Sequence, residues 1–157
     1  MKQRLNIREK GPKALRTLYG IETYMKDSPV EKSLRELINV RISQINGCAY
    51  CLDMHSKEAR ANQETEQRLY GLSAWRDAPY YSERERTALA WAEAVTQCVV
   101  PDAVYDEAKA HFSDEELIDL TLAITAINSW NRLNIAFLTA AGSYRVNNSP
   151  IAEERTA

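Results

Sequence analysis

Glycine and proline are scarce in this sequence, with five of each among 157 residues. No stretch alternates apolar and polar residues in the way that a half-buried strand does. Good helix formers are abundant instead, so the sequence predicts a nearly all-α protein. The length suits one ordinary domain, and residues 1–157 are expected to form a single domain.

An excess of charge of one sign is also missing, since the formal net charge is −2 at pH 7. This charge gives no electrostatic basis for binding nucleic acid or an anionic membrane. The most apolar stretch, residues 117–141, is interrupted by Arg132 and three asparagines, which excludes a transmembrane helix there. The first ten residues, MKQRLNIREK, carry charge with no apolar run behind them, so no secretory signal is expected.

Cysteine is rare as well, with three residues in the chain. An odd number of cysteines without a secretory signal favours a reducing compartment, and we expect a cytoplasmic protein. In that setting a CxxC pair is more often catalytic or metal-binding than structural.

Two of the three cysteines and one of the two histidines nevertheless fall within ten residues, NGCAYCLDMH at positions 46–55. If a helix starts after Gly47, spacings of three and four residues place Cys48, Cys51 and His55 on one helix face. The unpaired amides at a helix start favour a thiolate. A CxxC pair can lower a cysteine pKa from about 8.5 to roughly 3.5–7.5. The pattern indicates either a redox pair or a metal site.

Start signals divide the rest of the chain into helices. Gly11-Pro12 opens a first helix after a polar stretch, and Ser28 with Glu31 is read as a capping box for the next. This second helix is expected to end at Asn46-Gly47, and its apolar residues recur at spacings of three and four: Leu34, Leu37, Ile38, Ile42 and Ile45. The helix with the cysteines is expected to run to about residue 61. Later helices are expected at Pro101-Asp102 and after two further capping boxes, Ser82–Glu85 and Ser113–Glu116, with the longest helix over about residues 114–141.

Glu36 is the carboxylate that a helical hairpin brings toward the cysteines. It precedes Gly47 by 11 residues, and His55 follows Gly47 by 8. At roughly 1.5 Å per residue the two positions match to within a helical turn. Glu36 would then hold His55 while His55 takes a proton from Cys51, which is the logic of an activated nucleophile. The hairpin allows this contact without requiring it.

Other interpretations remain open for the same residues. Cys48, Cys51 and His55 supply three ligands for zinc, and Glu36 is a possible fourth. A half-buried glutamate near an arginine is more often part of a structural ion pair.

The remaining chemically distinctive side chains are expected to be structural. Cys98 is expected to pack in the core, and His111 to lie at the surface near a helix end. The three tryptophans are more consistent with packing than with a cofactor site: Trp75, Trp91 and Trp130.

The segment RELINVRISQINGCAYCLDMHSKEA, residues 35–59, resembles the core of the AhpD-like alkylhydroperoxidase branch of the carboxymuconolactone decarboxylase family. The family pattern is a glutamate, eleven residues, CxxC, three residues and a histidine. Four residues of this sequence fill it: Glu36, Cys48, Cys51 and His55. The resemblance extends over roughly residues 12–142, which would form the domain core, with residues 146–157 as a loose tail.

This resemblance implies an all-helical fold that assembles into homo-oligomers, often trimers or hexamers. It implies a thiol peroxidase that needs neither a cofactor nor a metal ion. Cys51 would attack the hydroperoxide substrate and become a sulfenic acid, and Cys48 would resolve it as a disulfide. Glu36 and His55 would relay the proton, directly or through water. An external thiol or a dihydrolipoyl-type reductant would restore the dithiol.

The sequence departs from the pattern of the well-studied AhpD enzymes at one site position. They carry a histidine between the cysteines where this chain has Tyr50, so either one proton carrier is missing or the phenol replaces it. The decarboxylase branch is less favoured, because the thiols would have no role in lactone decarboxylation. The competing hypotheses are a helical oligomer whose cysteines sense oxidants without turnover and a metal-binding helical module.

Overall fold

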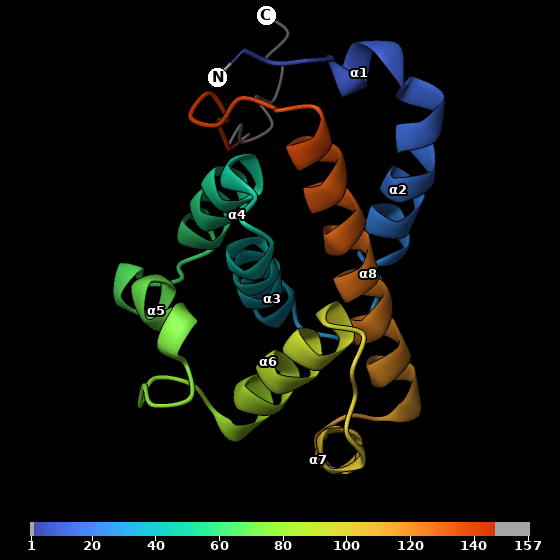
Figure 1. Ribbon diagram of the computed structural model, residues 1–157. Coiled ribbons are helices and arrows are strands. Elements are labelled where there is room, and N and C mark those ends of the chain that lie inside the picture. The colour runs from blue at the N-terminus through green and yellow to red at the C-terminus, as the bar shows by residue number, and fades with distance from the viewer. Residues whose placement is uncertain (1, 147–157) are drawn as a thin grey trace, which may run out of the picture.

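The computed structural model describes residues 2–146, and the tail predicted over 146–157 lies almost entirely outside that range. The described chain contains helices and no strands, as the sequence predicts (Figure 1). In chain order the elements are α1 (Ile7–Lys10), α2 (Pro12–Tyr24), α3 (Lys32–Asn46), α4 (Ala49–Ala61), α5 (Glu66–Gly71), the short 3₁₀ helix η1 (Leu72–Ala74), α6 (Glu83–Thr96), α7 (Asp102–His111) and α8 (Asp114–Ala136).

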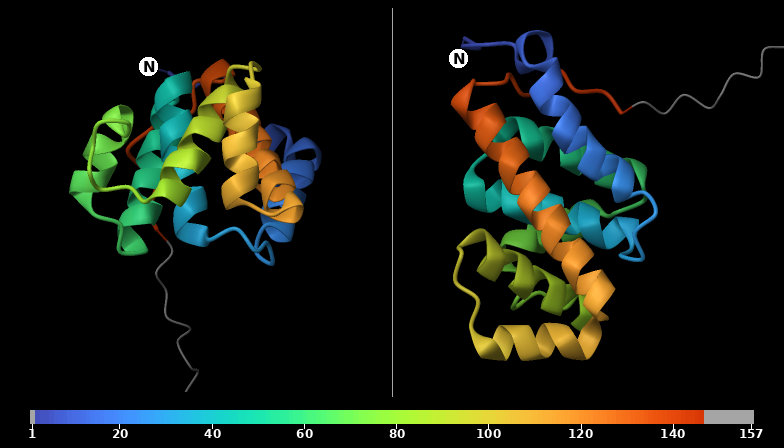
Figure 2. Two further views of the ribbon diagram at one scale, coloured as in Figure 1. Left: turned by 90° about the horizontal axis from the view of Figure 1, so that it is seen from below. Right: turned by 90° about the vertical axis from the view of Figure 1, so that its right-hand side faces the viewer.

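Helix α3 lies at the centre of the fold and contacts α4, α6 and α8. It is buried on two sides because its apolar residues follow two helical rows. Leu34, Ile38 and Ile42 pack with α6, α7 and α8. Leu37 and Val40 pack with α4, α5, η1 and α6. The two views in Figure 2 show α2 lying along the side of α8 that faces away from α6.

Two of the three predicted capping boxes are confirmed, at the starts of α6 and α8. The third prediction is wrong. Helix α3 starts at Lys32 with Glu31 as its N-cap, and no side chain caps it. The Glu31 carboxylate instead accepts hydrogen bonds from Arg84 at 2.9 and 3.1 Å. A partner 53 residues away has therefore replaced the local contact.

Helix α8 ends at Ala136, five residues before the predicted end. Arg4 supplies the reason, because its backbone N–H donates to the Phe137 carbonyl and its guanidinium to the Ala136 carbonyl. Leu138 then takes a left-handed conformation with φ 53°. The N-terminal stretch, which the sequence analysis describes only as polar, contains α1 and terminates α8.

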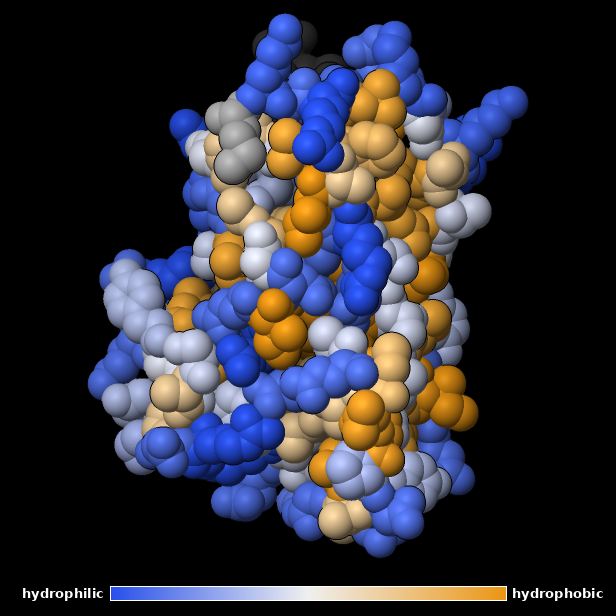
Figure 3. All heavy atoms as spheres, in the orientation of Figure 1, coloured by the Kyte–Doolittle hydropathy of each residue, from blue (hydrophilic) through white to orange (hydrophobic). Residues whose placement is uncertain are grey.

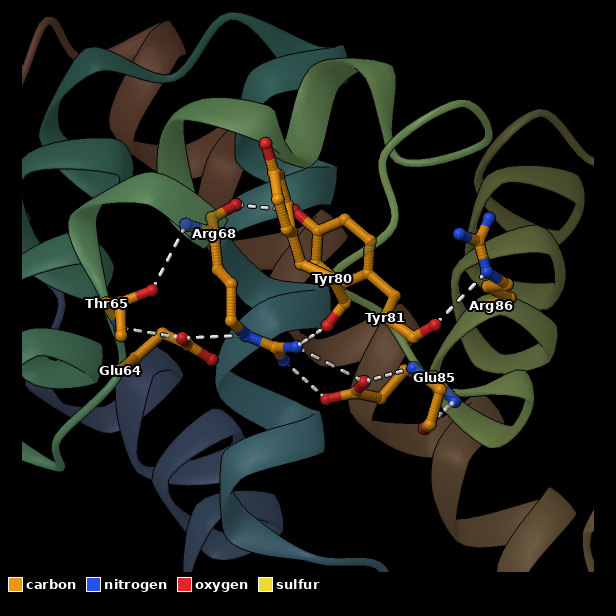
Figure 4. A network of polar contacts seen from close by, with 8 residues as sticks. Glu64, Thr65, Arg68, Tyr80, Tyr81, Glu85 and Arg86 are labelled. Carbon is orange, nitrogen blue, oxygen red and sulfur yellow. Dashed lines mark hydrogen bonds and ion pairs between the residues drawn. The ribbon is translucent and has the colours of Figure 1, made fainter.

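The loop between η1 and α6 is fixed by Arg68 of α5 (Figure 4). Its guanidinium pairs with Glu64 at 2.9 Å and with Glu85 at 2.5 Å, and it also bonds the Tyr80 carbonyl. The Tyr81 hydroxyl donates to the Arg68 carbonyl. This network attaches α5 to the start of α6 and leaves the cysteine helix to be positioned by other contacts.

Hydrophobic surface remains exposed over α7 and the start of α8 (Figure 3). Tyr105 and Ile118 are 47% and 68% exposed there. No helix among residues 2–146 is long and apolar enough to cross a membrane.

Candidate active site

The turn between α3 and α4 places both cysteines at the start of α4. Gly47 has φ 69°, a left-handed conformation that glycine adopts without strain, and it ends α3 as predicted. Cys48 is the N-cap of α4, and its sulfur accepts a hydrogen bond from the Cys51 N–H at 3.4 Å. A backbone amide of the helix start therefore points at the Cys48 sulfur, which favours negative charge there.

Cys48 and Cys51 form a disulfide, with their Cα atoms 5.4 Å apart. Their side chains are 1% and 0% exposed. The pair is therefore buried, and of the two cysteines Cys48 lines a pocket among those found in the described chain.

Helix α8 holds this turn through three asparagines spaced by three residues. Asn46 at the end of α3 donates to the side-chain oxygens of Asn128 and Asn131, at 2.9 and 2.8 Å. Asn131 also donates to the Ser43 hydroxyl at 3.1 Å. Asn134 donates to the Cys51 sulfur at 3.5 Å. The same residues that interrupt the apolar run of α8 therefore hold the turn that carries the two cysteines.

His55 lies two turns into α4, on the side of the helix that carries Cys51, and is buried. Its Nδ1 is 3.2 Å from Oε2 of Glu58, one turn further along α4. The angle of this contact is not that of a hydrogen bond, and within residues 2–146 both ring nitrogens are without one. The carboxylate beside His55 is thus Glu58, which the sequence reasoning did not single out.

Glu36 is buried, but it makes no ion pair with His55 among the described residues. It accepts a hydrogen bond from Asn62 at 2.5 Å and lies 3.6 Å from the Lys32 ammonium. The direct contact that the hairpin allows is therefore not formed, and Asn62, which follows α4, bonds Oε1 of Glu36 instead. Burial raises the pKa of Glu36, against the opposing effects of Lys32 and Asn62. Glu36 and His55 still line one solvent pocket of about 730 Å³.

With this geometry established, the comparisons with known proteins identify the family. The family model of the carboxymuconolactone decarboxylase family matches residues 11–94. The chain belongs to this family. The uncharacterized protein YdfG of Bacillus subtilis (strain 168) is 42% identical over 146 residues, which covers 91% of this chain and 99% of YdfG.

The solved structures place the chain among AhpD-like proteins. A protein of unknown function from Agrobacterium tumefaciens, ATU0492, whose name relates it to the antioxidant defence protein AhpD, has a TM-score of 0.87 and 40% identity. The match covers 91% of this chain and all of that one. The debrominase Bmp8 matches with a TM-score of 0.77 and 22% identity, over 86% of this chain and 74% of Bmp8, which shows the fold alone.

In this AhpD-like protein a pocket of about 320 Å³ leads to His55. Its walls come from α1, α2, α4 and α8 and combine aromatic or apolar side chains with a few polar groups: Ile7, Arg8, Tyr19, Tyr50, Met54 and Trp130. The Tyr50 hydroxyl accepts a hydrogen bond from Arg8 at 3.0 Å. Tyr50 also lines a second pocket of about 490 Å³, which reaches Cys48 and is otherwise lined by uncharged residues. The tyrosine thus stands between the two approaches to the site.

Three site residues of this AhpD-like protein escaped sequence reasoning: Glu58, Asn134 and Tyr144. Glu58 had a local signal, because a residue three positions after His55 lies on the same helix face. Asn134 had one in the spacing of the α8 asparagines. Tyr144 had none, since its contact with α4 depends on the path of the chain after α8.

Cys98 and His111 lie away from the site. Cys98 is exposed and follows the end of α6 with φ 58°, so the core prediction is wrong. His111 ends α7 and pairs with Glu107 at 3.2 Å, as expected of a residue near a helix end. Among residues 2–146 no group of three or more histidine, cysteine, aspartate or glutamate side chains is placed to hold a metal ion.

Proposed function

We propose that this protein is a thiol-dependent peroxidase that reduces hydroperoxides with the Cys48–Cys51 pair. The observation that carries the proposal is the joining of two buried cysteines at the start of α4, with His55 on the same helix and a pocket beside it. Two cysteines whose Cα atoms lie 5.4 Å apart can be joined as a disulfide, which suits a two-electron reduction.

The first step is attack of the Cys51 thiolate on the terminal oxygen of the hydroperoxide. The sulfur–oxygen bond forms, the oxygen–oxygen bond breaks, and the alkoxide leaves as an alcohol after taking one proton. The sulfur is oxidised by two electrons to a sulfenic acid. His55 and Glu36 relay the protons through solvent in their shared pocket, and the raised pKa of buried Glu36 favours its protonated, donating form.

The second step is attack of the Cys48 thiol on the sulfenic sulfur. The disulfide forms, hydroxide leaves, and the proton from Cys48 converts it to water. Two thiols of an external reductant then return the pair to the dithiol and are oxidised to a disulfide. Tyr50 is the auxiliary group in this proposal, placed between the pockets where other AhpD-like enzymes have a histidine.

The test is turnover of cumene hydroperoxide by purified protein, with dithiothreitol and then with a dihydrolipoyl carrier. Cys51→Ser is expected to abolish turnover, and Cys48→Ser to abolish recycling after one equivalent of peroxide. Cys98→Ser is the matched control, because this exposed cysteine lies away from the site and its loss should leave the rate unchanged. Full activity in Cys51→Ser would overturn the assignment.

Absence of turnover in the wild type would favour the alternative of a redox sensor, provided that peroxide still converts the dithiol to the disulfide. Mass spectrometry after alkylation of free thiols separates the two states. The sensor and the peroxidase share every structural feature of the pair and differ only in recycling by a reductant.

We further propose that the chain acts as a homo-oligomer, a trimer or a hexamer. The exposed apolar side chains of α7 and α8 support this, because a monomer gains nothing by presenting them to water. Light scattering of the purified protein should give three or six times the chain mass, and a mass of one chain would refute the proposal.

A further inference from the structure

His55 is surrounded by more ionisable groups than any sequence motif indicates. The two pockets that it lines contain such groups from every neighbouring element: Arg8 of α1, Tyr19 and Glu22 of α2, Lys26 after α2, Lys32, Arg35 and Glu36 of α3, Tyr50 and Glu58 of α4, and Tyr144 after α8. Among the described residues, Glu58 is the carboxylate that forms an ion-pair contact with the imidazole, 3.2 Å from Nδ1.

Glu58 is itself held from its other side. The Tyr144 hydroxyl donates to Oε1 of Glu58 at 2.5 Å, while Oε2 faces His55. The carboxylate therefore bridges the imidazole and the phenol. This leaves it little freedom to turn away from the ring.

The segment that carries Tyr144 is anchored to the same helix at two more points. Lys57 donates to the Tyr144 carbonyl at 3.1 Å, and Asp53 accepts from the Gly142 N–H at 3.0 Å. Asp53 and Lys57 also form an ion pair at 2.6 Å. Three residues of α4 thus bind the returning chain and fix the position of the phenol.

The charge states of this group suit a fixed carboxylate. Burial raises the pKa of Glu58, but His55 and Tyr144 outweigh that effect and the pKa lies below its ordinary value. Burial and the neighbouring Glu58 raise the pKa of Tyr144 to about 12. At neutral pH the carboxylate is therefore ionised and the phenol remains a hydrogen-bond donor.

We propose that Glu58, locked by Tyr144, is the positioning residue for His55: a small turn of the imidazole converts the 3.2 Å contact into a hydrogen bond and keeps a proton on Nδ1. The Nε2 lone pair is then free to accept a proton, as a general base near a thiol requires. A carboxylate that fixes an imidazole tautomer is a known arrangement for activating a nucleophile. The catalytic consequence rests on the proposed peroxidase function, whereas the tautomer does not.

The test is long-range ¹H–¹⁵N NMR of the reduced, ¹⁵N-histidine-labelled protein at neutral pH. The chain contains two histidines, and His111→Gln assigns them. We expect the Nδ1–H tautomer for His55 in the wild type and a shift toward the Nε2–H form in Glu58→Ala. Tyr144→Phe, which removes one hydroxyl, should move the ring in the same direction by less. It also serves as the test if Glu58→Ala does not fold.

Glu107→Ala is the matched control, since Glu107 pairs with the other histidine at the same distance of 3.2 Å. It should change the His111 signals and leave those of His55 unchanged. The proposal is overturned if His55 has the same tautomer in the wild type and in both Glu58→Ala and Tyr144→Phe.

Turnover of cumene hydroperoxide separates this proposal from the proposed function. In an active enzyme, Glu58→Ala should lower kcat/KM by about 10–100-fold, the scale on which outer partners of functional histidines act. An altered pH profile should accompany the loss. A tautomer shift in a protein without turnover refutes the peroxidase and leaves the positioning intact. Turnover that continues in Glu58→Ala with an unchanged tautomer refutes the positioning and leaves the peroxidase intact.

Discussion

Asn131→Ala tests whether the amide network on α8 holds the cysteine turn. Asn131 is completely buried, accepts a hydrogen bond from Asn46 at 2.8 Å and donates one to the Ser43 hydroxyl at 3.1 Å. Alanine removes both bonds, each worth about 1 kcal/mol, and leaves a buried hydroxyl without this partner, which costs about 1–3 kcal/mol. Asn46 keeps its bond to Asn128, so its own loss is small. We expect the free energy of unfolding to fall by about 2–4 kcal/mol.

The measurement is urea unfolding followed by tryptophan fluorescence, at one fixed protein concentration because an oligomer's stability depends on it. The corresponding fall in Tm is roughly 4–16 °C for a chain of this size. Thr125→Ala, an exposed site on the same helix, should stay within about 0.5 kcal/mol of the wild type. A second check is the double-mutant cycle with Ser43→Ala, which should show non-additivity because the two side chains are bonded.

A loss below about 0.5 kcal/mol for Asn131→Ala would refute the reasoning, since that is the size expected of a surface substitution. Additive losses in the cycle would refute the Ser43 contact in particular. Either result would mean that packing alone positions the turn.

Four further predictions concern stability. Gly47→Ala should destabilise the fold by about 1–2 kcal/mol, because φ is 69° there. Gly20 lies inside α2 with open space around it, so Gly20→Ala should stabilise the fold by about 0.5–1 kcal/mol. Chemical denaturation of the two variants distinguishes these opposite signs. Burial raises the pKa of Glu36, so its protonated form stabilises the fold at low pH, and that contribution is lost as the pH rises through the folded-state pKa. The effect of Glu36→Gln on the free energy of unfolding should therefore be more favourable at pH 7 than at pH 4. Burial raises the pKa of Glu93, but hydrogen bonds from a tryptophan and two arginines have the larger opposite effect, and the pKa lies below its ordinary value. Glu93→Gln should therefore destabilise the fold at pH 7, and this loss should shrink as the pH falls through the folded-state pKa. Arg68→Met should cost about 1–3 kcal/mol, because two carboxylates and the Tyr80 carbonyl lose their partner. Hydrogen exchange should rise first in α5.

The parts of the fold that were predictable are those encoded by neighbours in sequence. The capping boxes at Ser82 and Ser113 each join residues three positions apart, and both form. The same pattern at Ser28 fails because Glu31 has a stronger, charge-assisted partner in Arg84. The end of α8 was missed for a related reason, since its terminal carbonyls bind Arg4 from the opposite end of the chain.

The candidate site divides in the same way. Cys48, Cys51 and His55 were found because three- and four-residue spacings fix their relation within one helix. Glu36 was assigned to His55 from its distance along the hairpin, and that distance brings it to the same pocket but leaves it bonded to Asn62. Distance along two helices sets the level of a side chain and does not set the direction in which it points.

The asparagines of the apolar helix α8 indicate more about the fold than the sequence analysis drew from them. The asparagines of α8 excluded a membrane span, yet they also recur every third residue and so share a helix face. Buried amides need partners, and the carbonyls of α8 satisfy only part of this need, through the bonds of Asn128 to Ile124 and of Asn134 to Trp130. The remaining donors and acceptors favour contact with polar groups of another element, such as the turn that ends at Gly47. Asn131 and Asn134 do so, one at Asn46 and one at the Cys51 sulfur. Asking where each buried amide is satisfied would have placed α8 against the cysteine turn before any coordinates were known.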